Sequence, residues 1–276
     1  RNQSRRGYRL FSNRYKSIVK NLDMCIYAVP SSGSLIDYST YSAIMKSSNL
    51  YFEEVTDALP FSLIGIEGAI DCEEALIDFN AAKSFFAEKL DKVINYNTPI
   101  SFSDCIQMST SNQLVLDCTW NKIVPSDNYF YEVALMFRYD HVHRINIGLT
   151  LVDGDLFSIY PYDDLSSSVS HVKYTPIKRF DCPLDAYSFL NENRSNSFLP
   201  VQEKIENFIK SFFPRFNKYY INPRPLISIK TKTKSNFTAS RATYIEKNST
   251  NFYSVHAGKI DTIFDTEHLV LELLEG

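Results

Sequence analysis

The feature that most constrains the fold is a change of hydrophobic period after Pro125. Beyond it, apolar runs are rich in β-branched and aromatic side chains that recur with a period near two, which is typical of strands. Asp153-Gly154 is a tight-turn signal between two of these runs, so we expect a hairpin there. The expected strands cover residues 129–139, 145–152, 156–160 and 169–174. The middle of the chain is therefore expected to form an antiparallel sheet.

Helical spacing dominates before Pro125. The apolar residues within residues 15–27 recur in a mixed pattern that predicts a helix. Asp37 and Asp78 are suitable N-caps for two further helices. Short apolar runs at residues 93–96 and 113–119 predict strands. We therefore expect an α/β layer in this part of the chain.

The C-terminal part mixes both periods. A run of lysines at the end of one alternating segment, residues 226–234, indicates an exposed edge strand. The elements expected here are a helix over residues 200–214, strands over residues 226–234, 241–246 and 252–255, and a last helix over residues 265–274. The sheet of the middle part is expected to include the first of these strands.

Length, charge and cysteine content limit the classes of function. The 276 residues, 44% of them hydrophobic, suffice for one large domain or two interleaved smaller ones. The net charge of -3 is spread along the chain, so a small ligand is expected and nucleic acid is not. Five widely spaced cysteines without a CxxC pair favour neither a disulfide framework nor a zinc site. No apolar run approaches the ~20 residues that span a bilayer, and we expect a cytoplasmic protein.

Four segments, in the same order along the chain, resemble segments of the D-amino-acid-oxidase-like flavoproteins. They are Gly68-Ala69-Ile70 through Leu76-Ile77-Asp78 with the helix after it, Val115-Leu116-Asp117-Cys118-Thr119-Trp120, the aromatic block over residues 131–174, and the segment SVHAGKIDTI from Ser254 to Ile263. Each is short, and the ordered set carries the resemblance. The sequence departs from the family in lacking a glycine after Thr119, in having one glycine in the last segment, and in having no GxGxxG.

The resemblance implies an α/β (α+β) protein with a discontinuous FAD-binding domain of the glutathione-reductase-like type beside an antiparallel-sheet substrate domain. Residues 1–124 and 236–276 would mostly form the FAD-binding domain, and residues 125–235 mostly the substrate domain. The family's GxGxxG lies on an N-terminal βαβ start that receives the FAD pyrophosphate. Arg1 to Tyr8 resembles the loop after that unit. We therefore interpret the sequence as N-terminally truncated, and expect the chain to bind FAD poorly by itself.

The last segment supplies candidate flavin-binding residues, namely Gly258, Lys259, Ile260, Asp261 and Thr262. Gly258 lets the backbone approach a ring, the amides after it can face a ring oxygen at the start of a helix, and Lys259 adds a positive charge. The alternative is a plain strand-to-helix turn. A further candidate cofactor contact is the end of the predicted strand at Cys118, Thr119 and Trp120, because ligands of open α/β sheets lie at strand C-termini. There the backbone is the expected contact. The alternative for Trp120 is a packing residue, and the alternative for Cys118 is an inert buried thiol.

Four residues on or beside the predicted antiparallel sheet are candidates for substrate binding, namely Tyr160, Tyr162, His171 and Lys173. Arg179 follows them, and a cation of this kind would bind a carboxylate, whereas a tyrosine would bind an amino or hydroxyl group. The alternative is a half-exposed sheet with amphipathic side chains.

No catalytic residue and no metal ligand is identified. His141 and His143 lie two apart, but no third ligand is at suitable spacing. Motifs of hydrolases, zinc proteases, P-loop enzymes and kinases are absent from the sequence. We expect an FAD-dependent oxidoreductase that oxidises a C–H bearing an amino or hydroxyl group of a small substrate by hydride transfer. The alternative is a non-catalytic ligand- or protein-binding module derived from such a fold.

Overall fold

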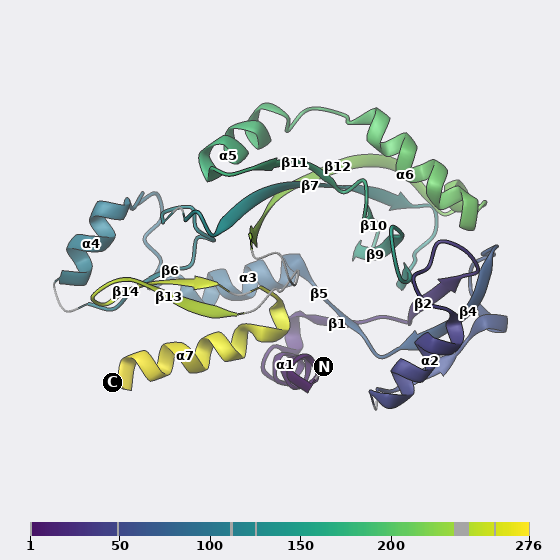
Figure 1. The fold of residues 1–276 in the computed structure, drawn as a ribbon, viewed down its shortest axis with the longest axis horizontal. Coiled ribbons are helices and arrows are strands. Elements are labelled where there is room, and N and C mark those ends of the chain that lie inside the picture. The colour runs from purple at the N-terminus through teal and green to yellow at the C-terminus, as the bar shows by residue number, and fades with distance from the viewer. Residues whose placement is uncertain are drawn as a thin grey trace.

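The computed structural model describes residues 2–48, 50–110, 113–124, 126–234, 243–256 and 258–275. Two long antiparallel strands arch across the molecule, with two helices on the outer side of the arch (Figure 1). The strands are β7 (Tyr129–His141) and β12 (Tyr220–Thr233), and the helices are α5 (Pro183–Glu192) and α6 (Leu199–Phe212).

The two long strands belong to a nine-stranded mixed sheet, in which β12 pairs with β7. In spatial order the path of strands is β11 (Pro176–Phe180), β7, β10 (Ser166–His171), β9 (Phe157–Asp163), β8 (Ile147–Leu151), β2 (Met24–Pro30), β4 (Ile66–Cys72) and β3 (Phe52–Glu54). Neighbouring strands are antiparallel except β2 and β8, which are parallel. Residues 1–124 thus contribute strands to the same sheet as the middle of the chain.

The antiparallel sheet predicted after Pro125 is confirmed. Strands β8 and β9 form the expected hairpin around Asp153-Gly154, with Leu149 opposite Ile159. Strand β12 includes nearly all of the predicted edge strand over residues 226–234, and ion pairs hold its lysine-rich end. Lys232 pairs with Glu132 of β7 at 2.7 Å, and Lys234 pairs with Asp181 at 2.9 Å.

A second sheet of three strands holds the C-terminal part of the chain. It consists of β13 (Tyr244–Ser249), β14 (Phe252–His256) and β6 (Val115–Asp117), followed in the chain by the 3₁₀ turn η4 (Ile260–Thr262) and helix α7 (Ile263–Glu275). Strands β14 and β6 run parallel, with Phe252 opposite Val115. Two segments from the stretches that the resemblance assigns to one FAD-binding domain are therefore neighbours in one sheet. Of the predicted strand over residues 241–246, the first two residues lie outside the described part.

The prediction for the N-terminal region was wrong. Residues 15–27 form no α-helix but the turn η1 (Lys16–Ile18), strand β1 (Val19–Asn21) and the first half of β2, and β1 pairs with β5 (Ala75–Ile77). Ile26 and Ala28 of β2 face the main core while Cys25 is buried on the other face, so the apolar run is a strand covered on both sides. Such short runs do not distinguish a strand from a helix by period.

Residues 1–12, which show no clear period, belong largely to helix α1 (Asn2–Arg14). Tertiary packing explains this helix, because Phe11 joins Ile18 and Phe264 in a second core cluster against α3 (Phe79–Leu90). Its apolar stripe is narrow and lies between arginines, so the helical period is weak in the sequence.

The strand predicted at residues 93–96 is also wrong. These residues form an exposed turn, with Val93 73% and Tyr96 62% exposed, and no strand in the described ranges pairs with them. The predicted strand over residues 113–119 is confined to β6. Besides α1, four elements had no prediction, namely α4 (Phe102–Thr110), β3, β11 and α5.

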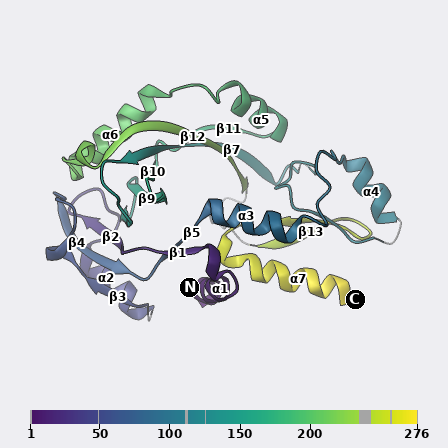
Figure 2. The same ribbon diagram turned by 180° about the vertical axis from the view of Figure 1, so that it is seen from behind.

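Both predicted N-caps are confirmed. The Asp37 carboxylate accepts the Thr40 amide at 2.7 Å at the start of α2 (Tyr38–Ser47), and Asp78 accepts the Ala81 amide at 2.9 Å at the start of α3. Helix α2 lies beside β4 at the end of the large sheet (Figure 2).

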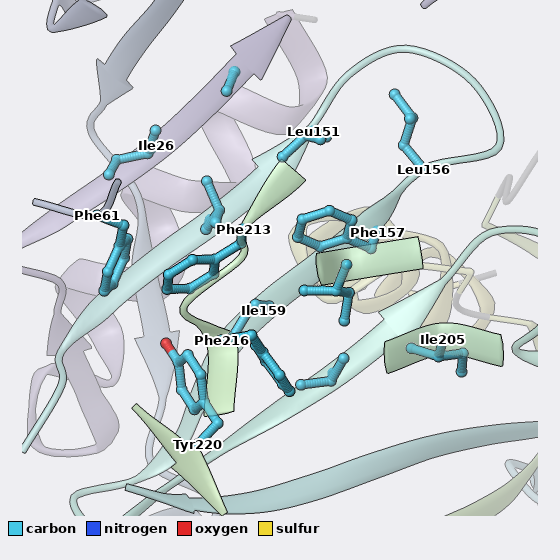
Figure 3. Close-up of a cluster of buried hydrophobic side chains, with 14 of the residues drawn as sticks. Ile26, Phe61, Leu151, Leu156, Phe157, Ile159, Ile205, Phe213, Phe216 and Tyr220 are labelled. Atoms are coloured by element: carbon cyan, nitrogen blue, oxygen red, sulfur yellow. The ribbon is translucent and has the colours of Figure 1, made fainter. Parts of the chain in front are cut away.

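The main core lies between the large sheet and α6. Ile205 and Ile209 of the predicted helix over residues 200–214 are fully buried. Phe213, Phe216 and Tyr220 follow them into the same cluster, which strands β8 and β9 line from the other side (Figure 3). This core packs tightly against one face of the sheet and supports it.

Candidate functional site

The C-terminal ends of the parallel strands β6 and β14 lie at one edge of the small sheet. Asp117, the last residue of β6, is 4% exposed. Its Oδ1 accepts the amide and the hydroxyl of Thr119 at 2.8 and 2.6 Å, whereas its Oδ2 has no partner among the described residues. A buried carboxylate oxygen without a donor is costly, so this edge is a place where a ligand donor is expected.

The three candidate residues after Asp117 turn away from the small sheet. Cys118 is exposed, and Trp120 has a positive φ of 62° and is 52% exposed. The carbonyl of Trp120 accepts the Thr231 hydroxyl at 3.0 Å, which ties the turn to β12. The structure thus places Trp120 in the solvent-facing turn rather than in a core.

The candidate segment after β14 leads into α7 through η4. Gly258 is half-buried, Lys259 and Ile260 are exposed, and Thr262 is buried with its hydroxyl donating to the Lys259 carbonyl at 2.8 Å. Asp261 touches α1, since a Cβ added to Gly7 would lie 1.7 Å from the Asp261 carbonyl oxygen. The segment is therefore packed directly on the N-terminal helix.

A cavity of about 1040 Å³ lies beside this contact. Asp261 lines it together with Arg5, Tyr8 and Arg9 of α1. Strands β2, β4 and β5, helix α2 and the connections after α2 and β4 form the other walls. From the sheet, Tyr27 of β2 and Glu74 between β4 and β5 reach the cavity. The cavity thus joins the predicted flavin segment to the large sheet.

A polar cluster surrounds the carboxylate of Glu74. The Tyr27 hydroxyl donates to Oε1 at 2.6 Å, and the Cys25 thiol and the Tyr160 hydroxyl donate to Oε2 at 3.1 and 3.3 Å. The Thr150 hydroxyl in turn donates to Tyr160 at 3.2 Å. Strands β2 and β9 therefore direct side chains at one carboxylate, and β8 supports one of them through Thr150.

Burial and the charge of Glu74 raise the pKa values around the cluster. Burial first and the Glu74 carboxylate second raise the pKa of Tyr27, Tyr160 and Cys25 above their ordinary values. The same two causes raise the pKa of the neighbouring Cys72 to about 12. The phenols and thiols consequently keep their protons at neutral pH and act as hydrogen-bond donors.

Of the candidate substrate residues, the structure brings Tyr160 to the cluster and places the others elsewhere. Tyr162 lies under the Arg138 guanidinium at 4.7 Å, and Arg179 lies over Phe130. His171 is 1% exposed, and its Nδ1 accepts the Lys173 amide at 3.1 Å. Neither His171 nor Lys173 lines the cavity.

Sequence reasoning missed Glu74, Tyr27 and Cys25. Interpreting residues 24–30 as a strand would have placed Cys25 and Tyr27 on one face, two residues apart. Glu74 lies between β4 and β5 in a stretch without a periodic signal, so only the fold reveals it. Among the described residues, no group of three potential ligands is arranged for a metal ion, and the five cysteines are free. His141 donates to or accepts from the Ser167 hydroxyl at 2.8 Å.

No family model matches the chain. An FAD-dependent monooxygenase of Fusarium mangiferae is 28% identical over 284 residues, which cover 99% of this chain and 75% of that protein. Glycine oxidase from Geobacillus kaustophilus has a TM-score of 0.66 at 11% identity, covering 97% of this chain and 75% of that one. Fructosyl peptide oxidase from E. terrenum has a TM-score of 0.62 at 12% identity, and the match covers 100% of this chain and 75% of that one.

No helix in the described ranges has the length and apolarity to cross a bilayer. The likeness to the two oxidases extends over nearly the whole chain, and it includes both the large sheet and the β6–β14 edge. The chain therefore has the fold of the D-amino-acid-oxidase-like flavoproteins, as its four ordered segments implied.

Proposed function

We propose that the protein is an FAD-dependent oxidoreductase that oxidises a C–H bond next to an amino or hydroxyl group of a small substrate. The fold shared with glycine oxidase and fructosyl peptide oxidase supports this, as does the FAD-dependent relative from Fusarium mangiferae. Fold alone does not determine function, so the proposal depends on the site.

The residues at the β6–β14 edge fit a flavin nucleotide. Asp117 has a buried carboxylate oxygen without a donor among the described residues, and a ligand hydroxyl can supply that donor. Gly258 has no side chain to block a close approach of the backbone to a ring. Gly258 to Thr262, with Cys118 to Trp120, are the residues proposed to contact the cofactor.

The position of the cavity carries the proposal. It extends from Asp261 in the proposed flavin segment to Tyr27 and Glu74 on the sheet, and its volume of about 1040 Å³ suits a small ligand. A substrate in this cavity lies between the cofactor segment and the polar cluster.

A bound flavin would supply the acceptor for a hydride from the substrate carbon. That carbon is left as an iminium carbon, or as a carbonyl carbon once a hydroxyl proton has left. The chain's own part is to orient the substrate C–H, to exclude water and to hold the amino or hydroxyl group.

Replacement of Gly258 tests the proposal in the full-length protein. Gly258→Val adds a branched side chain where the ring is proposed to lie, so we expect the flavin absorbance per protein to fall to a small fraction of the wild-type value. The melting temperature of the flavin-free form should change little. Absorbance and melting temperature are measured on the same preparations.

Gly33→Val is the matched control, because Gly33 has a φ of +86° in a loop outside the cavity and no atom within 4 Å of an added Cβ. It should lower stability through backbone strain and leave flavin content unchanged. Full flavin occupancy and unchanged turnover in Gly258→Val would refute the assignment of this segment. A wild-type protein that binds small ligands but no flavin would favour a binding module instead.

A further inference from the structure

The cavity beside α1 has charged and uncharged lining on different walls. Its charged side chains come from α1, from the proposed flavin segment and from the connection after β4. Helix α2 and the connection after it contribute only uncharged side chains, namely Tyr41, Met45, Leu50 and Tyr51. We call these four residues the α2 wall. A ligand that fills the cavity therefore contacts charged groups on some sides and a mainly apolar surface on another.

The α2 wall lies across α1 from the proposed flavin segment. That segment leads into α7, and the two views of the molecule both show α7 on one side of α1 and α2 on the other (Figure 1, Figure 2). The turn η4, which holds Asp261, packs on α1. A substrate whose reacting C–H lies at the flavin segment therefore extends its other end toward the α2 wall.

The α2 wall suits a flat apolar group. Tyr51 is 67% exposed, Tyr41 and Leu50 are half-buried, and Met45 lies on the same face of α2 as Tyr41, four residues further on. A group that packs here removes apolar surface from water, which is favourable in proportion to the area buried. A ring gains further from edge-to-face or offset-stacked contacts with the tyrosines.

The size of the cavity agrees with such a group. Its volume of about 1040 Å³ lies at the upper limit of the roughly 300–1,000 Å³ that is usual for sites of drug-sized ligands. The cavity therefore has room for a ring at the α2 wall as well as for the reacting group.

The Tyr41 hydroxyl is a hydrogen-bond donor that has no partner among the described residues. Burial first, and the proximity of Cys72 and Glu74 second, raises the pKa of Tyr41 above its ordinary value, so the phenol keeps its proton at neutral pH. Cys72 and Glu74 line the cavity from the sheet side, so the hydroxyl lies where α2 faces the sheet. An oxygen atom of a ligand in the cavity can accept this hydrogen bond.

We propose that the part of the substrate remote from the oxidised C–H is an uncharged ring that packs on the α2 wall and bears an oxygen that accepts a hydrogen bond from Tyr41. This inference rests on the proposed function, because it places the reacting end of the substrate at the flavin segment. It holds for a reacting amino group and a reacting hydroxyl group alike. Tyr41 and Leu50 are then residues that determine specificity.

Calorimetric titration of the full-length protein with matched probes tests the inference. Benzyl alcohol is compared with ethanol for the ring, and 4-methoxybenzyl alcohol with 4-ethylbenzyl alcohol for the oxygen, because the methoxy and ethyl groups have nearly the same shape. The corresponding amines form a second series, and the series that binds more tightly is evaluated. We expect the ring to strengthen binding by about tenfold or more, and the methoxy oxygen by roughly three- to tenfold.

Two variants separate the hydrogen bond from the apolar contact. Tyr41→Phe removes the hydroxyl and keeps the ring, so it should weaken the methoxy probe by roughly three- to tenfold and leave the ethyl probe unchanged. Leu50→Asn nearly keeps the volume and makes the wall polar, so it should weaken every ring probe by roughly tenfold and leave the ringless probe unchanged. Melting temperatures of the same samples show whether each variant is folded.

Tyr162→Phe and Leu35→Asn are the matched controls. Tyr162 lies under the Arg138 guanidinium, Leu35 is 77% exposed, and neither side chain lines the cavity. All probe affinities should therefore stay within about twofold of wild type in both variants, a change of only a few tenths of a kcal/mol.

Three results would overturn the inference. They are ring probes that bind no more tightly than the ringless probe, a methoxy probe that binds no more tightly than the ethyl probe, and an unchanged methoxy preference in a folded Tyr41→Phe protein. Flavin content of the same samples separates this test from that of the proposed function. Absence of ring preference with full flavin overturns only the role of the α2 wall, and absence of flavin from the wild type overturns the oxidoreductase.

Discussion

At the scale of single residues, Gly7 decides how closely α1 approaches the candidate cofactor segment. A Cβ at this position would lie 1.7 Å from the Asp261 carbonyl oxygen and 2.6 Å from its carbon, so the backbone itself must move. Alanine normally stabilises a helix relative to glycine by about 0.5–1 kcal/mol. We expect the opposite for Gly7→Ala, a loss of about 1–3 kcal/mol of unfolding free energy from overpacking, measured by denaturant unfolding.

Asn13→Ala is a suitable control, because Asn13 is exposed in the same helix. It should leave stability unchanged or raise it slightly through helix propensity. If Gly7→Ala stabilised the protein as Asn13→Ala does, the contact between α1 and Asp261 would not exist as described.

At the scale of elements, a cap and an ion pair define the start of α3. The Asp78 carboxylate accepts the Ala81 amide at 2.9 Å and pairs with Lys20 at 2.8 Å, and these interactions, the backbone hydrogen bond first among them, lower its pKa. Asp78→Ala leaves a first-turn amide without a partner. We expect a loss of about 1–2 kcal/mol in unfolding free energy, measured by denaturant unfolding near neutral pH.

The other end of the same helix offers the comparison. Asp91 lies just after α3, where a negative charge is unfavourable to the helix dipole. Asp91→Ala should therefore be neutral or slightly stabilising. If Asp91→Ala lowered the unfolding free energy as much as Asp78→Ala, the capping hydrogen bond of Asp78 would not be the cause of that loss.

At the scale of the whole molecule, Phe11 connects the N-terminal helix to the C-terminal helix. It lies 7% exposed in a cluster with Ile18 and Phe264, and its ring centroid is 4.9 Å from that of Tyr15. Phe11→Ala should lower the unfolding free energy by about 3–5 kcal/mol, since it removes a buried aromatic ring. Because α1 also forms a wall of the cavity, the affinity for a ligand in the cavity should fall together with the stability. Calorimetry measures the affinity and thermal melting measures the stability of the same variant.

Leu35→Ala is the control for that prediction, as Leu35 is 77% exposed in a surface loop. The unfolding free energy of the Leu35→Ala variant should stay within about 0.5 kcal/mol of the wild-type value. Unchanged ligand affinity in a destabilised Phe11→Ala protein would show that α1 does not shape the cavity.

Local signals in the sequence determined the strands after Pro125, the hairpin at Asp153-Gly154 and the two helix starts at Asp37 and Asp78. Each depends on alternation, turn chemistry or a capping side chain within a few residues, so no distant partner is needed to recognise it. The order of four short segments likewise indicated the fold before any contact was known. Local period did not determine α1 or β2, because both obtain their stability from partners far along the chain.

Tertiary structure alone decided the cavity and its chemistry. Glu74 has no sequence pattern that marks it, yet Tyr27 from β2 and Tyr160 from β9, 133 positions apart in the sequence, meet at its carboxylate. Tyr160 was a candidate for its residue type and contacts Glu74 from β9, whereas His171 at the end of β10 and Lys173 after it form no hydrogen bond to that cluster among the described residues. The physical reason is that the face of a strand follows from its alternation, but which faces surround a common space depends on how the sheet and helices pack.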